Sequence, residues 1–317
     1  MPMDKKYDHV LTSIEKNLSS VVYGKGKESK LLIIALLSGG HVLIEGVPGT
    51  GKTMLIKTLA KSIESEFRRI QCNPDLLPTD ITGFSIYHPK DEQFVFRPGP
   101  VMTNFLLIDE INRASTKTQS ALLEAMEEKQ VTVDGIVYPI PEPFFVMATQ
   151  NPIEFEGTYL LPEAQLDRFM MKFHLGYPEK KTEKEILYSH GSFSIPEIKA
   201  VTNLATLQEI QRDVSQVYVS ESVVDYLLTI AEKTRTHPSI FLGVSPRGTL
   251  ALMDGVKALA YLEKRDFVTP DDVKTLLPYV FFHRMILEPE AQMNGNTVES
   301  IMETVLEEVE VPIRLEK

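Results

Sequence analysis

The sequence predicts an α/β fold: a parallel sheet of about five strands flanked by helices, followed by a small all-helical domain. Three observations support this prediction. Short apolar runs of strand length recur through the first half of the chain and alternate with segments of helical length. One of these runs leads through a glycine-rich turn directly into a helix. Beyond about residue 176, strand-like runs end and capped helical segments follow.

The candidate strands are five short apolar runs. They occupy residues 41–45, 67–71, 105–108, 144–148 and 170–175. Parallel strands need crossover connections, which are usually helices. Segments of helical length lie before and between the runs, over about 4–20, 26–38, 52–62 and 115–128. The segment 26–38 is apolar nearly all round, so we expect that helix to be buried.

Two segments do not fit this simple alternation. Residues 84–97 and 129–140 each contain two runs of strand-like residues, and Asp134-Gly135 separates the runs of the second segment. Asp-Gly between such runs is a strong signal for a two-residue hairpin turn. We therefore predict two hairpin inserts. The sequence leaves two interpretations of them open: decoration at the edge of the sheet, or loops that face a pore and contact a partner.

The second half of the chain predicts a separate helical domain. A charged, proline-containing stretch at 177–205 is the expected linker between a nucleotide-binding domain over 1–176 and a lid over 206–317. In the lid, helices are expected over 207–217, 221–236, 246–264 and 270–283. Capping signals mark their starts: Thr206 with Glu209, and the run Thr269-Pro270-Asp271-Asp272.

Composition narrows the class of protein. The chain has 317 residues, with 33 Lys and Arg against 44 Asp and Glu, and a formal net charge of −11. Wide contact with a nucleic-acid backbone needs clustered basic residues, so nucleic acid is a disfavoured partner. The single cysteine, Cys72, is expected to be a packed residue. No secretory signal is visible and the longest apolar run, 31–37, is too short to span a membrane, so a cytoplasmic location is expected.

Residues 46–53 match the pattern G-x-x-x-x-G-K-[ST] in full. They follow a predicted strand and open a predicted helix, the context in which this pattern binds nucleotide phosphates. Glycines let successive backbone N–H groups curl around phosphate oxygens at the positive end of the helix. Lys52 is expected to reach the β- and γ-phosphates, and the Thr53 hydroxyl to ligate Mg²⁺. The expected nucleotide-binding residues of this segment are Gly46, Pro48, Gly49, Thr50, Gly51, Lys52, Thr53 and Met54.

Two acidic residues follow the predicted strand at 105–108. Charges that abut a buried strand are unfavourable unless they have a task. Asp109 is placed to hold the Mg²⁺ shell, and Glu110 to orient or deprotonate the attacking water, which favours hydrolysis over phosphoryl transfer to another substrate. The alternative is a pair of solvated acids at a strand end. Asn151, after the run 144–148, could hydrogen-bond the lytic water or the γ-phosphate; its alternative is a turn-forming residue before Pro152.

Arginines supply further candidates. Arg168 lies just before the last predicted strand. Arg247 lies in the first turn of a predicted helix, behind a Ser cap and an N1 proline, from which it could bridge to the γ-phosphate. Arg113 is a candidate of the same kind. Each has the alternative of an ordinary surface ion pair, and the residues alone do not decide between the two.

Taken together, these segments resemble MoxR-family AAA+ ATPases. The resemblance runs through nearly the whole chain and is carried by Val22-Tyr23-Gly24, 46–53, 74–83, 108–114, 119–127, 148–152, 156–169 and Ser245-Pro246-Arg247. It departs from the family pattern at Asn73, Thr116 and Leu160, where Thr, Pro or Ala, and Pro are usual. None of these three belongs to the expected catalytic set, so the departures concern the shape of loops.

The resemblance implies a hexameric ring with ATP bound between subunits. It makes Asn151 sensor 1, Arg247 sensor 2 reached from the lid, and Arg168 the arginine finger that completes the neighbour's site. Val22 and Tyr23 would border the adenine. The segment 84–97 would correspond to the family's helix-2 insert, and 129–140 to its pre-sensor-1 hairpin.

The resemblance also implies a function, which is Mg²⁺-dependent ATP hydrolysis that drives chaperone-like remodelling or maturation of a protein partner, often one with a von Willebrand A-type domain. In this hypothesis ATP binds in the cleft between the α/β domain and the lid, and lid rotation moves the hairpins against the partner. Three alternatives remain: the motor subunit of a metal-chelatase-like complex, a nucleic-acid motor, and a nucleotide-gated switch with negligible turnover. The 84–97 insert is not basic, which counts against the second. Glu110 counts against the third, because a switch has no need of a water-activating acid.

Overall fold

The computed structural model describes residues 6–47, 49–151, 158–189 and 198–312. Its central feature is a five-stranded sheet in the order β2-β5-β8-β1-β9, in which every neighbouring pair is parallel. The predicted parallel sheet of about five strands is therefore confirmed. The strands are β1 (Val42–Glu45), β2 (Phe67–Gln71), β5 (Phe105–Asp109), β8 (Phe145–Gln150) and β9 (Met171–His174).

Successive side chains of a strand point to opposite faces of the sheet, so the core is divided into two apolar clusters, one on each face. Leu43, Leu106 and Val146 belong to the cluster that helix α5 covers, whereas Phe105 and Phe145 belong to the larger cluster on the other face. The larger cluster includes α1 (Asp8–Val21), α2 (Gly26–Leu37) and α3 (Lys52–Ser62); the smaller includes α4 (Pro78–Thr82) and α5 (Thr116–Glu128). Helix α2 is buried along most of its length, as its apolar sequence predicted.

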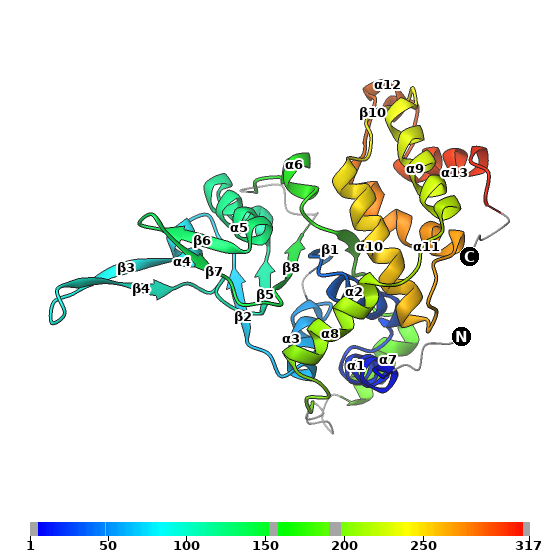
Figure 1. Ribbon diagram of the computed structural model, residues 1–317. Helices are drawn as coiled ribbons and strands as arrows, with labels where there is room; N and C mark the ends of the chain where they lie inside the picture. Colours follow the sequence, from blue (N-terminus) through cyan, green and yellow to red (C-terminus); the bar gives the residue numbers. More distant parts are fainter. Residues whose placement is uncertain (1–5, 48, 152–157, 190–197, 313–317) are drawn as a thin grey trace.

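Both predicted inserts are antiparallel hairpins. Strands β3 (Gly83–His88) and β4 (Gln93–Pro98) form the first, and β6 (Gln130–Val133) and β7 (Ile136–Pro139) form the second. Figure 1 shows the β3–β4 hairpin reaching away from the rest of the molecule. Asp134 and Gly135 both have positive φ, 52° and 79°, as a two-residue turn that matches the strand twist requires.

The region after the sheet is helical, as predicted, and packs against the face that α2 covers. Helix α10 contacts α2, and α11 contacts β9. The helices of this region are α7 (Lys180–Ser189), α8 (Leu204–Ser215), α9 (Glu221–Thr236), α10 (Pro246–Leu262), α11 (Pro270–Phe281), α12 (Pro289–Met293) and α13 (Val298–Glu308); the short α6 (Glu163–Leu166) lies before β9. Figure 1 shows the last six, from α8 on, gathered to one side of the sheet.

Some details of this region differ from the prediction. A short antiparallel pair, β10 (Ile240–Leu242) and β11 (Ile286–Leu287), interrupts the helices. Helix α8 begins at Leu204 rather than Leu207 because Asn203 is its cap: the Asn203 side chain accepts a hydrogen bond from the Thr206 N–H. Helix α7 lies inside the expected linker. The boundaries 1–176, 177–205 and 206–317 stay a prediction. Among the described residues, no helix combines the length and the apolar character needed to cross a bilayer.

Candidate active site

The glycine-rich turn at 46–51 joins β1 to α3 at the edge of the sheet where the strands end. Gly46 can only be glycine, because a Cβ there would lie 2.5 Å from the carbonyl oxygen of Leu175. Gly49 and Gly51 have φ values of 83° and 92°, a region that L side chains rarely adopt. The turn therefore has the curled backbone of a phosphate cradle, next to the unpaired N–H groups of the first turn of α3. Pro48 lies outside the described residues.

Lys52, at the start of α3, lies inside this turn. Its Nζ donates to the carbonyl oxygen of Gly46 at 2.6 Å. Burial lowers the pKa of Lys52, and the carboxylates of Asp109 and Glu110 oppose that shift. Thr53 is partly exposed in the same turn. An ammonium, a hydroxyl and two carboxylates around one glycine turn suit a nucleotide with Mg²⁺, since Mg²⁺ prefers oxygen ligands.

Other residues expected to bind nucleotide sit around the turn. The buried Val22 follows α1, and its Cγ1 lies 3.7 Å from the place where a Cβ on Gly51 would be. Tyr23 follows and is partly buried. Thr50 donates to the carbonyl oxygen of Val47 at 3.1 Å, and Met54 packs against the larger core cluster. The structure thus places Val22 beside the glycine turn, as a residue that borders the base would have to be.

Asp109 is buried at the end of β5 and is already paired. Its Oδ2 accepts from the guanidinium of Arg69 at 2.7 and 2.8 Å, and its Oδ1 accepts from the Thr149 hydroxyl at 3.0 Å. Glu110 follows with φ 55°, and its Oε2 accepts from Gln71 at 3.0 Å and from Arg113 at 3.1 Å. Each of the two carboxylates is thus hydrogen-bonded by different side chains.

Three of these partners were not foreseen in the sequence: Arg69, Gln71 and Thr149. A usable signal was present, since Gln71 and Thr149 lie at or near the ends of strands on either side of β5, and the register pairs Gln71 with Asp109. Arg113, a candidate arginine, pairs with Glu110 of its own chain. Cys72 is buried at the same edge, and burial raises the pKa of its thiol to about 12, as for a packed residue.

Asn151 lies at the same edge of the sheet as the glycine turn. It follows β8, the strand next to β1, and Gln150 pairs in register with Glu45. The Gly46 N–H donates to the Gln150 carbonyl at 3.2 Å, which ties the start of the glycine turn to this strand end. Asn151 is buried, and its carbonyl accepts from the Asn112 side chain at 3.5 Å. The structure therefore brings Asn151 together with the glycine turn.

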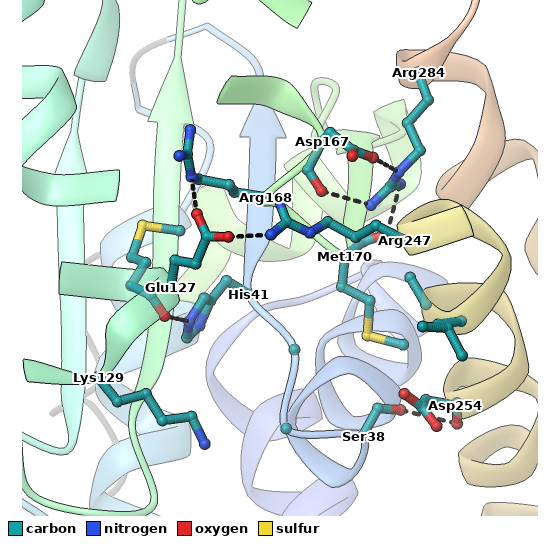
Figure 2. A pocket seen from close by; sticks show the side chains of 15 residues that line it. Ser38, His41, Glu127, Lys129, Asp167, Arg168, Met170, Arg247, Asp254 and Arg284 are labelled. Atoms are coloured by element: carbon teal, nitrogen blue, oxygen red, sulfur yellow. Dashed lines mark hydrogen bonds and ion pairs between the residues drawn. The ribbon is translucent and has the colours of Figure 1, made fainter. Parts of the chain in front are cut away.

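Arg168 and Arg247 lie together, but at the opposite edge of the sheet. Arg168 lies just before β9. Met170, the residue before that strand, donates its N–H to the carbonyl of His41, which is the residue before β1. Both arginines bind the carboxylate of Glu127 (Figure 2). Arg168 donates from Nε to Oε2 at 2.6 Å, and Arg247 donates from Nη2 to Oε1. The glycine turn follows β1, whose four residues alone span about 13 Å. Neither arginine thus lies at the nucleotide turn of its own chain.

A cavity of about 300 Å³ adjoins this pair. Its lining includes Gly40, His41, Glu127, Arg168 and Arg247, from both the sheet domain and α10. Hydrogen bonds from the two arginines lower the pKa of the Glu127 carboxyl, and the bond from Arg168 has the larger effect. The carboxylate is therefore ionised at neutral pH.

A buried ion pair fixes the backbone on either side of the cavity. Arg284 is 4% exposed, and its Nε donates to Asp167 at 2.7 Å (Figure 2). Its other nitrogens bind the carbonyls of Phe169 and Met170 at 2.7 and 3.2 Å. The Asp167 carboxylate also accepts from the Ser245 hydroxyl, which caps α10 and accepts from the Gly248 N–H. The residues next to Arg168 and Arg247 are therefore tied directly to one another.

Comparisons with known proteins agree with this architecture. Residues 41–171 match a family model described as an ATPase family associated with various cellular activities (AAA), and residues 232–305 match a model of an AAA lid domain. A crystal structure of a proposed ATPase from Cytophaga hutchinsonii superposes with a TM-score of 0.90 at 39% identity, over 96% of each chain.

Curated relatives extend over most of the chain. Chaperone MoxR1 of Mycobacterium tuberculosis is 40% identical over 96% of this chain and 83% of its own length. Protein MoxR of Paracoccus denitrificans is 31% identical over 87% of this chain and 88% of its own length. The uncharacterised protein YeaC of Bacillus subtilis is 50% identical over 94% of both chains.

Proposed function

The chain belongs to the MoxR family of AAA ATPases, and from that premise we propose that it hydrolyses ATP with Mg²⁺ in a ring of identical subunits and uses the cycle to remodel a protein partner. The observation that carries the proposal is the assembly at one sheet edge of the glycine turn, Lys52, Asp109, Glu110 and Asn151. These groups come from three strand ends: the glycine turn and Lys52 follow β1, Asp109 and Glu110 lie at the end of β5, and Asn151 follows β8.

The chain's own residues divide the work at this edge. The N–H groups of the turn and Lys52 bind the β- and γ-phosphates, while Thr53 and Asp109 hold Mg²⁺. The metal ion, when bound, neutralises charge on the phosphate oxygens. Glu110 orients a water molecule for attack, with Gln71 and Arg113 donating to its Oε2. Asn151 hydrogen-bonds that water or the γ-phosphate.

The arginine pair completes the site of a neighbouring subunit. Arg168 and Arg247 lie where the strands begin and the glycine turn lies where they end, so neither can serve the nucleotide of its own chain. In a ring, the sheet edge at which the strands of one subunit begin faces the nucleotide of the next subunit. Both arginines then reach the γ-phosphate of that nucleotide. This placement favours an Arg247 that acts across the subunit contact, in place of one that reads its own nucleotide from the lid.

The partner in this proposal is a protein. MoxR1 of Mycobacterium tuberculosis is named a chaperone, and the hairpins offer an apolar surface: Phe84, Tyr87 and Phe94 of β3–β4 are 48, 50 and 73% exposed. Phe96 stacks on Tyr138 of β7 at 4.0 Å, so the two hairpins can move as one surface. A hexameric ring, a von Willebrand A-type client and a cytoplasmic location belong to the same proposal.

The test is ATP hydrolysis by the purified chain with two matched variants. Lys52→Ala should lose nucleotide binding and hydrolysis together. Glu110→Gln should bind a fluorescent ATP analogue as the wild type does but hydrolyse ATP about 10²–10⁴-fold more slowly. Hydrolysis that survives Glu110→Gln unchanged would show that Glu110 does not activate water. A wild-type protein that binds ATP but does not hydrolyse it would contradict the proposal of a hydrolytic motor.

A further inference from the structure

Glu127 has a task that the nucleotide edge does not explain. One carboxylate joins two arginines from separate parts of the chain, Arg168 before β9 and Arg247 on α10 (Figure 2). We propose that Glu127 is a positioning residue, which holds Arg168 and Arg247 side by side as a single receptor for the phosphates bound by the neighbouring subunit. This inference rests on the proposed function, because it needs both arginines to act across the contact.

Charge explains why such a residue is needed. Two guanidinium groups in one small cavity repel each other, and repulsion favours rotamers that move the two groups apart. Glu127 offsets this, since each of its oxygens accepts from one arginine. The three groups together carry a net charge of about +1. Of the other charged groups that line the cavity, Asp167 is paired with the buried Arg284, and the charge of Asp254 is matched by that of Lys129. The cluster therefore stays attractive to phosphate.

The backbone at this place is fixed without Glu127. Asp167, Ser245 and Arg284 tie the segment before β9 to the cap of α10. Removing the Glu127 carboxylate should thus free two side chains and leave their backbones in place. Exposed ion pairs add little stability, and the side chains of Glu127, Arg168 and Arg247 are 31, 29 and 45% exposed. We expect Glu127→Gln to fold normally.

Partial exposure also fits the role. The Arg247 guanidinium uses one nitrogen on Glu127. Arg168 uses Nε, with a longer contact from Nη1 to the Ala164 carbonyl at 3.4 Å. The remaining N–H donors can turn toward a phosphate while the carboxylate keeps its hold. The amide of glutamine is uncharged and has one acceptor oxygen, so it neither offers a separate oxygen to each arginine nor offsets their mutual repulsion.

Mixed rings test the proposal. Acceptor subunits carry Arg168→Ala and keep Glu110. They can hydrolyse their own ATP but offer no arginine finger to the neighbouring subunit. Donor subunits carry Glu110→Gln and keep both arginines. Each is nearly inactive alone, and mixing should restore hydrolysis at acceptor sites that face a donor. Adding Glu127→Gln to the donor should then lower the restored rate by about 10- to 100-fold, as for a misplaced catalytic group.

The control is Glu128→Gln in the donor, a change on the next residue of α5, which should leave the restored rate unchanged. The same Glu127→Gln in the acceptor should have a much smaller effect than in the donor. A donor effect that is absent, or equal in donor and acceptor, would overturn the role of Glu127. If mixing restores no hydrolysis at all, the proposal of arginines acting across the contact fails, and this inference fails with it.

Discussion

At the scale of single residues, the strand-end acids depend on a hydroxyl. The buried Thr149 donates to Asp109 at 3.0 Å and accepts from the Glu110 N–H at 2.9 Å. Thr149→Val keeps the shape and removes the hydrogen-bond partner of the Asp109 Oδ1 and of the Glu110 N–H, while Asp109 keeps Arg69. We expect a loss of about 1–3 kcal/mol in the free energy of unfolding, together with a lower kcat. Urea denaturation measures the first; Thr149→Ser, which keeps the hydroxyl, should restore both.

His41 makes stability depend on pH. Its Nδ1 accepts from the Val146 N–H at 3.2 Å and its Nε2 faces the Met126 carbonyl at 3.3 Å, an arrangement that fits the neutral ring. Burial lowers the pKa of His41 to about 4. The unfolded chain takes up this proton below pH 6.5, so stability that is full above pH 6.5 is lost as the pH falls toward 4.

The expected loss from His41 is about 3 kcal/mol across that interval. It is measured as the difference in pH dependence between wild type and His41→Asn, because asparagine can keep an acceptor for the Val146 N–H and does not titrate. If wild type and variant lose stability in parallel between pH 6.5 and 4, His41 is not the source of the dependence.

At the scale of elements, the start of α11 shows a local sequence signal at work. Thr269 caps the helix, and the buried Asp272 binds the Thr269 N–H and hydroxyl and also Arg265 at 2.6 and 2.8 Å. Thr269→Ala should lower the unfolding free energy by about 1 kcal/mol. Asp272→Ala should lower it by about 3–5 kcal/mol, since it leaves Arg265 partly buried without its main partner. Thermal melts of both variants check this order; a smaller effect for Asp272→Ala would contradict it.

Sequence patterns predicted the elements well where the signal is local. The cap at Ser115, the hairpin turn at Asp134-Gly135 and the buried helix α2 all follow from residues within a few positions. The start of α8 was placed too late, because Thr206 and Asn203 both offer capping side chains and only the structure shows that Asn203 is used. The strands β10 and β11 are too short to carry a periodic signal, and they pair across some 40 residues.

At the scale of the whole molecule, a buried arginine strengthens the contact between the sheet domain and the lid. Arg284 binds Asp167 and the carbonyls of Phe169 and Met170. Arg284→Met should cost about 3–5 kcal/mol, because a carboxylate loses its partner in a partly buried place. Denaturant unfolding of Arg284→Met measures this. An unchanged midpoint would show that the lid is held in other ways.

The position of the arginine pair was partly predictable. A residue just before a parallel strand and a loop just after one lie at opposite edges of the sheet, so the order along the chain already separated Arg168 from the glycine turn. Arg247 had no such signal, since its place depends on how the lid packs. Glu127 could not be foreseen either, because nothing local distinguishes it from Glu124 or Glu128 on the same helix.

In the proposed ring, arginines of one subunit complete the nucleotide site of the next. The most direct measurement is ATP hydrolysis per molecule against protein concentration, for wild type and Arg168→Ala, with light scattering in the presence and absence of ATP. We expect wild-type activity to rise with concentration and to follow the oligomer. Arg168→Ala should bind ATP yet lose about 10³–10⁵ in rate. Activity that is flat with concentration, and equal in the variant, would contradict it and leave a self-contained ATPase.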